Sequence, residues 1–278
     1  MSARVLITGA ASGIGAATVT ELRARGARVV GLDVNPSGDD ILACDVRDQA
    51  SVDAAVAAAV ERLGGLDVLI NCAGIGDPQS AGTVPGEDAL RVLDVNLLGP
   101  WRVTAAALPA LREARGRVVN VASGLAFLTV PLATAYCMSK RGLVAYSDAL
   151  RAEHGDAITV TTVYPGYIRT PIHAAAGAKG VALEGLVPAE RLEDAARTLV
   201  RAALGPPARD LATTRRGGFG YALLRATPRG LVDRALRRRL RRAVARGHFD
   251  NSEIAGALRA GLSRQPSATT SSSAHSSG

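Results

Sequence analysis

Residues 4–33, RVLITGAASGIGAATVTELRARGARVVGLD, decide the fold of this chain of 278 residues. Residues 4–8 are a short apolar run that ends at glycines, which predicts a buried strand. Residues 16–25 contain no helix breaker and are followed by a glycine, which predicts a helix and its end. Residues 27–33 predict a second buried strand. This strand–helix–strand order implies a right-handed crossover between parallel strands.

The same alternation of strands and helices continues as far as Gly166. Val, Ile and Leu are concentrated in the expected strands, which indicates a sheet covered by helices on both faces. The segment between Asp33 and Asp45 is too short for the usual crossover helix, so we expect a loop there. We predict an α/β fold with a doubly wound parallel sheet, Rossmann-like, in a single domain with a C-terminal helical extension. The further expected strands are residues 42–46, 68–71, 117–121 and 158–164, and the expected helices are residues 51–63, 89–113 and 135–154.

Beyond Gly166 the pattern is less regular. Residues 173–187 are rich in Ala and Gly, which suggests a mobile lid. Residues 188–204 predict a helix, residues 210–215 a last strand, and residues 231–244 a helix with an apolar stripe among arginines.

We divide the chain into three parts. Residues 1–205 are the expected dinucleotide-binding and catalytic domain, and residues 206–262 are an extension with a basic helix packed on the same domain. Residues 263–278 are Ser-rich and lack large apolar side chains, so we expect this tail to be disordered.

The composition excludes several classes of protein. With 47% hydrophobic and 21% charged residues, the chain is neither mainly disordered nor a collagen nor a coiled coil. It holds no apolar run long enough for a membrane span, and its first residues reach a glycine before a signal-peptide core could form. We therefore expect a cytoplasmic protein. The three cysteines, Cys44, Cys72 and Cys137, lie far apart and are expected to be buried or partly buried thiols, not a disulfide framework or a metal site.

The net charge of +8 is concentrated in one segment. Residues 225–246 hold nine arginines and one aspartate, so they account for the whole excess. We favour a packing helix at the substrate mouth or at a dimer interface, with its arginines in solvent. Contact with a membrane surface is the second interpretation, which would make the protein peripheral to a membrane. Nucleic acid is not expected as a partner, because aromatic residues are only 3% of the chain and no recognition module is visible.

A glycine-rich turn follows the first expected strand and precedes the first expected helix. Gly9, Gly13 and Gly15 allow backbone N–H groups to approach a pyrophosphate, whose charge also suits the positive end of a helix. Ser12 and Ile14 lie in the same turn. The position of the turn favours a nucleotide site over a purely structural turn.

Asp33, at the end of the second strand, indicates the type of cofactor. A carboxylate there accepts hydrogen bonds from both ribose hydroxyls of NAD and repels the 2′-phosphate of NADP. No cation stands at Ser12 or Val34, so NAD is favoured over NADP; the alternative is an Asp that only caps a turn. Other candidate cofactor contacts are Asp45 and Val46 for the adenine, and Asn71, Ala73 and Gly74 for the adenosine side.

Tyr136 and Lys140 are four residues apart and share one face of an expected helix. An ordinary tyrosine, with a pKa of ~10, is a poor acid or base near neutrality, and a nearby positive charge lowers that pKa. Such a tyrosine can exchange a proton with a substrate oxygen. Ser123, at the end of a strand, offers a hydroxyl that could polarise the same oxygen.

Taken in order, these motifs resemble the classical short-chain dehydrogenase/reductase family over roughly residues 1–205. The resemblance implies hydride transfer between nicotinamide C4 and a carbonyl or carbinol carbon. It gives Tyr136 the role of general acid/base, Ser123 that of holding the substrate oxygen, and Lys140 that of binding the nicotinamide ribose and lowering the Tyr136 pKa. The motifs are Thr8-Gly9-x-x-x-Gly13-x-Gly15, Asp45, Asn71-x-Ala73-Gly74, Asn96, Ser123, Tyr136-x-x-x-Lys140 and Pro165-Gly166.

The resemblance assigns two further roles. Asn96 would support a water-mediated proton relay. Pro165, Gly166, Ile168 and Thr170 match the segment that lies beside the nicotinamide in this family, where the Ile168 backbone and the Thr170 hydroxyl could hold the carboxamide.

The C-terminal part departs from the common family pattern. It lacks the Val-Asp-Gly-Gly-like end of many tetrameric members and is similar to that of members acting on lipid-like alcohols and ketones, which argues against a housekeeping 3-oxoacyl carrier-protein reductase. The likeness to the family also suggests a homo-oligomer, dimer or tetramer, with the helices of residues 89–113 and 135–154 at the interface. Candidate substrate contacts are Ser123, Leu125, Tyr136, Tyr167 and His173.

We therefore predict an NAD-dependent oxidoreductase that interconverts a hydrophobic secondary alcohol and its ketone. One alternative is an NADPH-dependent ketoreductase of a biosynthetic pathway, against which only Asp33 speaks. A second alternative is a non-catalytic dinucleotide sensor or scaffold, against which Ser123, Tyr136 and Lys140 speak. No catalytic metal is expected, because no cluster of side chains has metal-ligand spacing.

Overall fold

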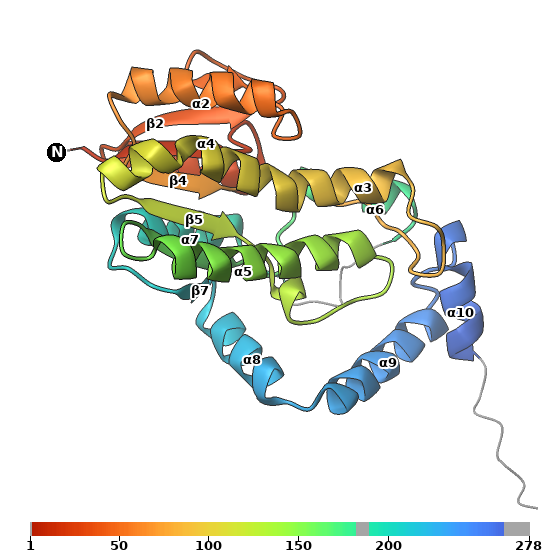
Figure 1. Ribbon diagram of the computed structural model, residues 1–278. Coiled ribbons are helices and arrows are strands. Elements are labelled where there is room, and N and C mark those ends of the chain that lie inside the picture. The colour runs from red at the N-terminus through yellow and green to blue at the C-terminus, as the bar shows by residue number, and fades with distance from the viewer. Residues whose placement is uncertain (1, 182–188, 264–278) are drawn as a thin grey trace, which may run out of the picture.

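The computed structural model of the chain describes residues 2–181 and 189–263 (Figure 1). In this part of the chain a sheet of seven parallel strands has the order β3-β2-β1-β4-β5-β6-β7. The order runs outward from β1 in both directions, as in a doubly wound fold. The strands are β1 (Arg4–Thr8), β2 (Arg28–Asp33), β3 (Ile41–Ala43), β4 (Val68–Asn71), β5 (Arg117–Val121), β6 (Thr159–Tyr164) and β7 (Asp210–Ala212).

Successive side chains of the central strands point into two different cores. In β1, Leu6 joins one cluster of buried side chains, while Val5 and Ile7 join the other. Helices α1 (Gly13–Ala24) and α7 (Leu192–Leu204) cover the face of Val5 and Ile7. Helices α2 (Gln49–Leu63), α4 (Gly99–Glu113) and α5 (Thr134–His154) cover the face of Leu6. The prediction of a parallel sheet covered on both faces is confirmed.

The helix expected over residues 89–113 is interrupted. Helix α3 (Glu87–Leu93) is followed by a π-helical turn, η1 (Asp94–Leu98), and then by α4. Pro100 has no N–H, so it cannot make the α-helical hydrogen bond to the carbonyl of Asn96. The N–H of Gly99 donates to the carbonyl of Asp94, five residues earlier, which is the hydrogen bond of a π-helix. This wider turn sets Asn96 into the interior, where its side chain is fully buried.

The C-terminal part contains more helix than the sequence predicted. Strand β7 ends at Ala212 and is followed by α8 (Arg215–Ala226), which we did not predict. The hydroxyl of Thr214 accepts a hydrogen bond from the N–H of Gly217 and so caps α8. Helix α9 (Arg229–Ala245) matches the expected basic helix. The turn η4 (Glu253–Ala255) and helix α10 (Gly256–Ser263) follow.

Two expectations fall partly or wholly outside the described residues. The first part of the expected lid forms the short elements η3 (Pro171–His173) and α6 (Ala174–Ala178), whereas residues 182–187 are not described. The tail of residues 264–278 is not described either. None of the described helices is long and apolar enough to cross a membrane.

Helix α9 packs on the body of the protein through a small apolar cluster. Leu240 of α9 packs with Phe249, Ala255, Leu132 and Val181. Leu132 precedes α5 and Val181 follows α6, so this cluster places α9 at the carboxyl edge of the sheet.

The loops after β1 and β4 lie close together at that edge. The Thr8 hydroxyl accepts hydrogen bonds from the N–H groups of Cys72 and Ala73, both at 3.0 Å. Chain connections leave β1 and β4 in opposite directions along the sheet, which opens a crevice at their carboxyl ends. This crevice is where a doubly wound sheet is expected to bind its ligand.

Candidate active site

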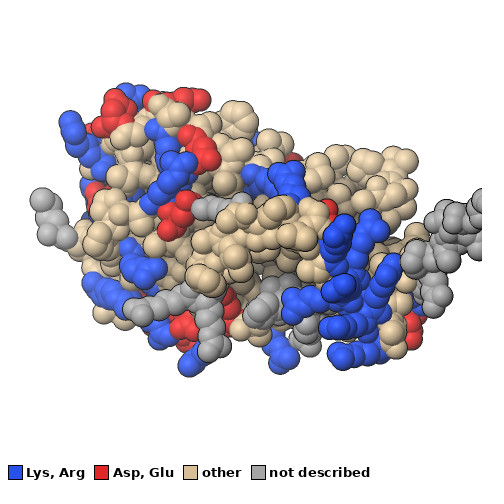
Figure 2. Space-filling model, turned by 90° about the horizontal axis from the view of Figure 1, so that it is seen from below, with Lys and Arg blue, Asp and Glu red and all other residues tan. Residues whose placement is uncertain are grey.

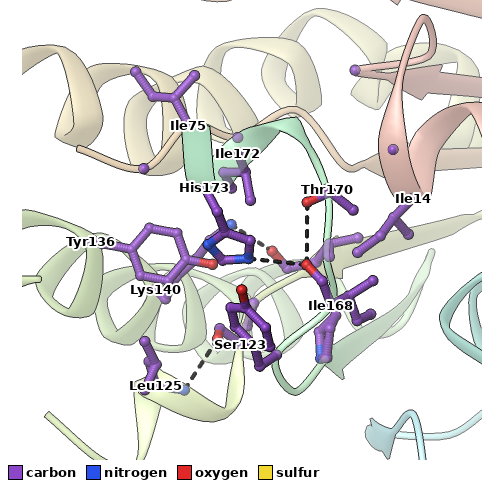
Figure 3. Close-up of a pocket in the computed structure, with 18 of the residues that line it drawn as sticks. Ile14, Ile75, Ser123, Leu125, Tyr136, Lys140, Ile168, Thr170, Ile172 and His173 are labelled. Atoms are coloured by element: carbon purple, nitrogen blue, oxygen red, sulfur yellow. Dashed lines mark hydrogen bonds between the residues drawn. The ribbon is translucent and has the colours of Figure 1, made fainter. Parts of the chain in front are cut away.

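A cavity of ≈ 1440 Å³ occupies the carboxyl edge of the sheet and runs from the glycine-rich turn to α8 (Figure 3). The structure brings together there nearly all of the site residues expected from the sequence. Only Asn71 and Asn96 do not line it. The expected residues that do are Gly9, Ser12, Gly13, Ile14, Gly15, Asp33, Asp45, Val46, Ala73, Gly74, Ser123, Leu125, Tyr136, Lys140, Pro165, Gly166, Tyr167, Ile168, Thr170 and His173.

The glycine-rich turn has no room for a side chain at Gly9 or at Gly15. Gly9 has a φ of 69°, and a Cβ there would lie 2.8 Å from the Cα of Ala73. A Cβ on Gly15 would overlap the carbonyl oxygen of Gly9. The N-terminus of α1, which follows, has neither a side-chain cap nor an acidic residue in its first turn. Its positive end therefore faces the cavity uncompensated, which suits a bound pyrophosphate.

Asp33 holds the glycine-rich turn from the end of β2. One carboxylate oxygen accepts from the N–H of Ala11 at 2.9 Å, and the other accepts from the N–H of Asn35 at 3.0 Å. A carboxylate has about four acceptor positions, so both oxygens can still bind hydroxyl groups. Asp45 is paired with Arg47, and hydrogen bonds from that guanidinium hold the pKa of Asp45 below its usual value.

Asn71 and Asn96 lie beneath the cavity, where they support its floor. The amide of Asn71 donates to Thr104 and to Asn120. The side chain of Asn96 accepts from the N–H of Ile75 at 2.8 Å and donates to the carbonyl of Ile75 at 2.9 Å. Both side chains thus fix the course of the chain around Gly74, which does line the cavity.

Ser123, Tyr136 and Lys140 converge in the middle of the cavity (Figure 3). Ser123 follows β5 and begins the short helix η2 (Gly124–Ala126), with its hydroxyl accepting from Leu125 N–H at 3.1 Å. The Ser123 hydroxyl lies near enough to the Tyr136 phenol to favour its ionised form and so to act on its pKa. Lys140 lies one turn further along α5, with Nζ 5.7 Å from the Tyr136 ring centroid, and donates to the carbonyl of Val121 at 2.9 Å.

Burial governs the acidity of these groups. It raises the pKa of Tyr136 to about 12, although the nearby Ser123 side chain acts in the opposite direction. It lowers the pKa of Lys140 to about 8. Desolvation of the phenolate is the largest cause of the raised Tyr136 pKa, so Tyr136 is protonated at neutral pH in this structure. That Lys140 lowers the Tyr136 pKa stays a prediction.

The segment after β6 folds back on itself beside Tyr136. The carbonyl of Ile168 accepts from the Thr170 hydroxyl at 3.4 Å and is hydrogen-bonded to His173 Nε2 at 3.0 Å. The rings of Tyr167 and His173 are 4.6 Å apart. His173, expected to bind substrate, is thus already engaged with the chain, and it lines the cavity with one side of its ring (Figure 3).

The thiols are as expected, and none of the described residues form a cluster for a metal. Cys44 and Cys137 are buried and Cys72 is partly buried, all of them free, which confirms the prediction for the three cysteines. Within the described ranges no group of three or more His, Cys, Asp or Glu side chains could hold a metal ion.

Residues 3–180 match the family model described as short chain dehydrogenase. The chain belongs to the short-chain dehydrogenase family. The match ends before α7, so α8 and α9 of this short-chain dehydrogenase lie outside the matched region.

Three similar proteins illustrate the range of the family. The D-threitol dehydrogenase of Mycolicibacterium smegmatis is 36% identical over 204 residues, which are 67% of this chain and 78% of that protein. The retinol dehydrogenase 5 of Homo sapiens is 40% identical over 189 residues, 62% of this chain and 58% of that protein. A 3-ketoacyl-(acyl-carrier-protein) reductase from Brucella melitensis, solved with NADH, has a TM-score of 0.66 and 29% identity, covering 75% of this chain and 95% of that one. This short-chain dehydrogenase is accordingly an NAD(P)-dependent alcohol dehydrogenase or ketone reductase.

Glu190 and Tyr221 are among the cavity residues that were not predicted from the sequence. Glu190 accepts from the N–H of Gly166 at 2.8 Å and from the hydroxyls of Thr213 and Thr214, so it ties the segment after β6 to the start of α8. Tyr221 of α8 packs against Gly124, where a Cβ would lie 2.7 Å from its ring. No sequence motif marks Glu190, and Tyr221 was missed because α8 itself was not predicted.

An ion-pair cluster lies at the wall of the cavity, to which Asp77 and Arg91 belong. Lys179, after α6, pairs with the buried Asp77 and with Asp88 of α3, and Arg91 pairs with the same two carboxylates. This cluster holds the described part of the expected lid against α3. The segment from 171 to 181 thereby forms a wall of the cavity in the short-chain dehydrogenase.

Replacing Lys140 by Met should remove a gain of stability with rising pH. An ordinary lysine titrates near 10.5, whereas the pKa of buried Lys140 is about 8. Between these values the unfolded chain binds more protons than the folded chain, so stability rises with pH. We expect the difference in unfolding free energy between the natural protein and Lys140→Met, measured by urea denaturation, to grow with pH over this interval.

Lys179→Met is the matched control, because Lys140 and Lys179 are the two lysines of the chain. Hydrogen bonds with Asp77 and Asp88 raise the pKa of Lys179, so its removal should not abolish the gain between pH 8 and 10.5. A pH-independent difference for Lys140→Met would show that Lys140 is not desolvated.

Proposed function

We propose that this short-chain dehydrogenase is an NAD-dependent oxidoreductase that interconverts a hydrophobic secondary alcohol and its ketone. The observation that carries the proposal is the convergence of Ser123, Tyr136 and Lys140 in the same cavity as the glycine-rich turn. Beyond these residues the cavity wall is mainly apolar, which suits a hydrophobic substrate. The apolar side chains at that end include Leu125, Leu128, Leu132, Ile172, Val181, Leu223 and Leu224.

Each reactive residue has a separate role in the proposed hydride transfer. The dinucleotide, when bound, accepts or supplies the hydride at nicotinamide C4. The Ser123 hydroxyl and the Tyr136 phenol bind the substrate oxygen, and Tyr136 gives it a proton when a ketone is reduced and takes the proton back when an alcohol is oxidised. Lys140 is mostly charged at neutral pH and can donate to a ribose hydroxyl from beneath Tyr136.

The cofactor would be held by the residues that fit its parts. The backbone around Gly9, Gly13 and Gly15 and the end of α1 suit the pyrophosphate. Asp33 retains free acceptor positions for the two ribose hydroxyls, and its charge disfavours a 2′-phosphate. We assign Asp45 and Val46 to the adenine and Ile168 and Thr170 to the carboxamide; all four residues line the cavity.

A second part of the proposal is that the protein forms a homo-oligomer through α4 and α5. Trp101 and Met138 are 57% and 56% exposed on these helices, and Trp101 stacks on Tyr146. Leu90 of α3 is similarly exposed. Large exposed apolar side chains on neighbouring helices mark a protein–protein interface.

Sedimentation equilibrium should therefore give a dimer or tetramer. Trp101→Glu should shift the association equilibrium toward the monomer. A natural protein that sediments as a monomer would contradict this part.

Tyr136→Phe should nearly abolish turnover while leaving NAD binding almost unchanged. The variant keeps the ring and its packing but removes the only group assigned to proton transfer. We expect the rate of alcohol oxidation, followed by absorbance of the reduced nicotinamide across a panel of hydrophobic alcohols, to fall roughly 10²–10⁴-fold.

Tyr146→Phe is the control for this variant. Tyr146 lies on the same helix and is also largely buried, with a pKa raised to about 12, but it does not line the cavity. Its replacement should leave turnover within the range of the natural protein. Full activity in Tyr136→Phe would refute the assigned role, and a natural protein that binds NAD but turns over no alcohol or ketone would favour a sensor or scaffold.

Asp33→Ala and Asp33→Asn should weaken NAD and relax the discrimination against NADP. Loss of charged hydrogen bonds to the ribose corresponds to an affinity for NAD that is lower by about 10- to 100-fold. Asp33→Asn keeps an oxygen for the Ala11 N–H, so it separates the effect of charge from loosening of the glycine-rich turn. Dissociation constants measured by fluorescence titration provide the comparison.

The control for the Asp33 variants is Asp53→Ala, on the exposed side of α2, which should change neither affinity. If the natural protein bound NADP as tightly as NAD, the assignment of Asp33 would fail. The NADPH-dependent ketoreductase would then be the better description of the enzyme.

A further inference from the structure

Helices α8 and α9 form a V that projects below the sheet and leaves its outer side uncovered (Figure 1). On α9 the single fully buried side chain among the described residues is Leu240, which packs on the body of the protein. The face of α9 opposite Leu240 therefore points away from the protein.

That outer face is strongly basic. Helix α9 contains seven arginines and one aspartate, Asp233. Arg234, Arg238 and Arg242 are spaced by four residues, so they form one row on the helix, and all three are exposed. In the described part of the chain none of these three pairs with a carboxylate. Figure 2 shows lysine and arginine side chains gathered at this place on the underside of the molecule.

Large apolar side chains are exposed on α9 and on α8. Leu231, in the first turns of α9, is 54% exposed. On α8, Phe219 and Leu223 are four residues apart on one face and are 75% and 56% exposed. We call Phe219, Leu223, Leu231, Arg234, Arg238 and Arg242 the basic surface.

We propose that the basic surface docks on an anionic lipid bilayer. Arginines would lie at the anionic headgroups, and Phe219 and Leu231 would enter the boundary between headgroups and acyl chains. Nucleic acid would match the positive charge, but its phosphate backbone would not bury these exposed apolar side chains. A second copy of the chain packed through the same surface would bring two rows of arginines together, which charge repulsion opposes.

Docking in this way would place the mouth of the cavity at the membrane. Leu223, Leu224 and Arg239 all line the cavity, so α8 and α9 border the end where apolar substrate would enter. A hydrophobic alcohol or ketone dissolved in the bilayer would then reach Tyr136 without crossing water. The docking itself does not depend on the proposed chemistry, since it is measured without substrate.

Flotation of the full chain with vesicles tests the proposal. We expect the protein to float with vesicles of phosphatidylcholine and phosphatidylglycerol, but not with phosphatidylcholine alone, and to be released by high salt. Replacing Arg234, Arg238 and Arg242 by Gln should lower the partition coefficient roughly 100-fold, as expected for three basic residues near an anionic surface. Phe219→Ser with Leu231→Ser should lower it as well, most clearly at high salt.

The matched control is the replacement of Arg112, Arg115 and Arg201 by Gln. These three arginines are also exposed, but they lie at the amino edge of the sheet, opposite the cavity. Removing the same charge there should leave vesicle binding within about threefold of the natural protein. Unchanged turnover of a water-soluble alcohol in every variant would show that each one is folded.

Three results would overturn the proposal. One is equal loss of vesicle binding in both arginine triples, because binding would then follow net charge and not this surface. Another is failure of the natural protein to float with anionic vesicles. The third is retention of duplex DNA, without vesicle binding, that is lost in the α9 triple, since the surface would then serve nucleic acid.

Discussion

The close approach of the turn after β1 to the loop after β4 is the constraint on which the cavity depends. Gly9 lies so near Ala73 that a side chain at Gly9 would collide with the backbone of Ala73. A change in the path of either loop would therefore require a change in the other. The Thr8 hydroxyl fixes the distance by accepting from both Cys72 and Ala73. The crevice for a dinucleotide, the position of Gly74 and the place of Lys140 beside it all follow from this single contact.

Buried polar groups carry this arrangement outward from the crevice. The amide of Asn71 donates to Asn120 and Thr104, and the amide of Asn120 donates to Ser147 of α5. The side chain of Asn96 makes two hydrogen bonds with the backbone of Ile75. Such groups stabilise a fold only when they are paired, so they also define one position for each element that they join. Helix α5 is held in this way, and with it the spacing of Tyr136 and Lys140.

The sequence was most informative where local pattern and final packing agree. Apolar runs such as residues 68–71 and 117–121 became strands with those bounds, and the glycine turn lies where its neighbours predicted. The π-helical turn at Asn96 was missed because one proline alters hydrogen bonding without disturbing the helical period. Helix α8 was missed because its Gly-rich sequence has low helix propensity. The helix is stabilised instead by the Thr214 cap and by the packing of Tyr221 on Gly124. The raised Tyr136 pKa was missed because spacing reports a nearby charge and not the burial around it.

The carboxylate of Glu190 joins three segments that are distant in the sequence. It binds the backbone of Gly166, beside the expected nicotinamide position, and the hydroxyls of Thr213 and Thr214 at the start of α8. A displacement of α8 is therefore transmitted to Gly166, and a displacement of Gly166 is transmitted to α8. Events at the rim and events in the interior are thermodynamically linked through this one side chain, and the coupling has the same magnitude in both directions.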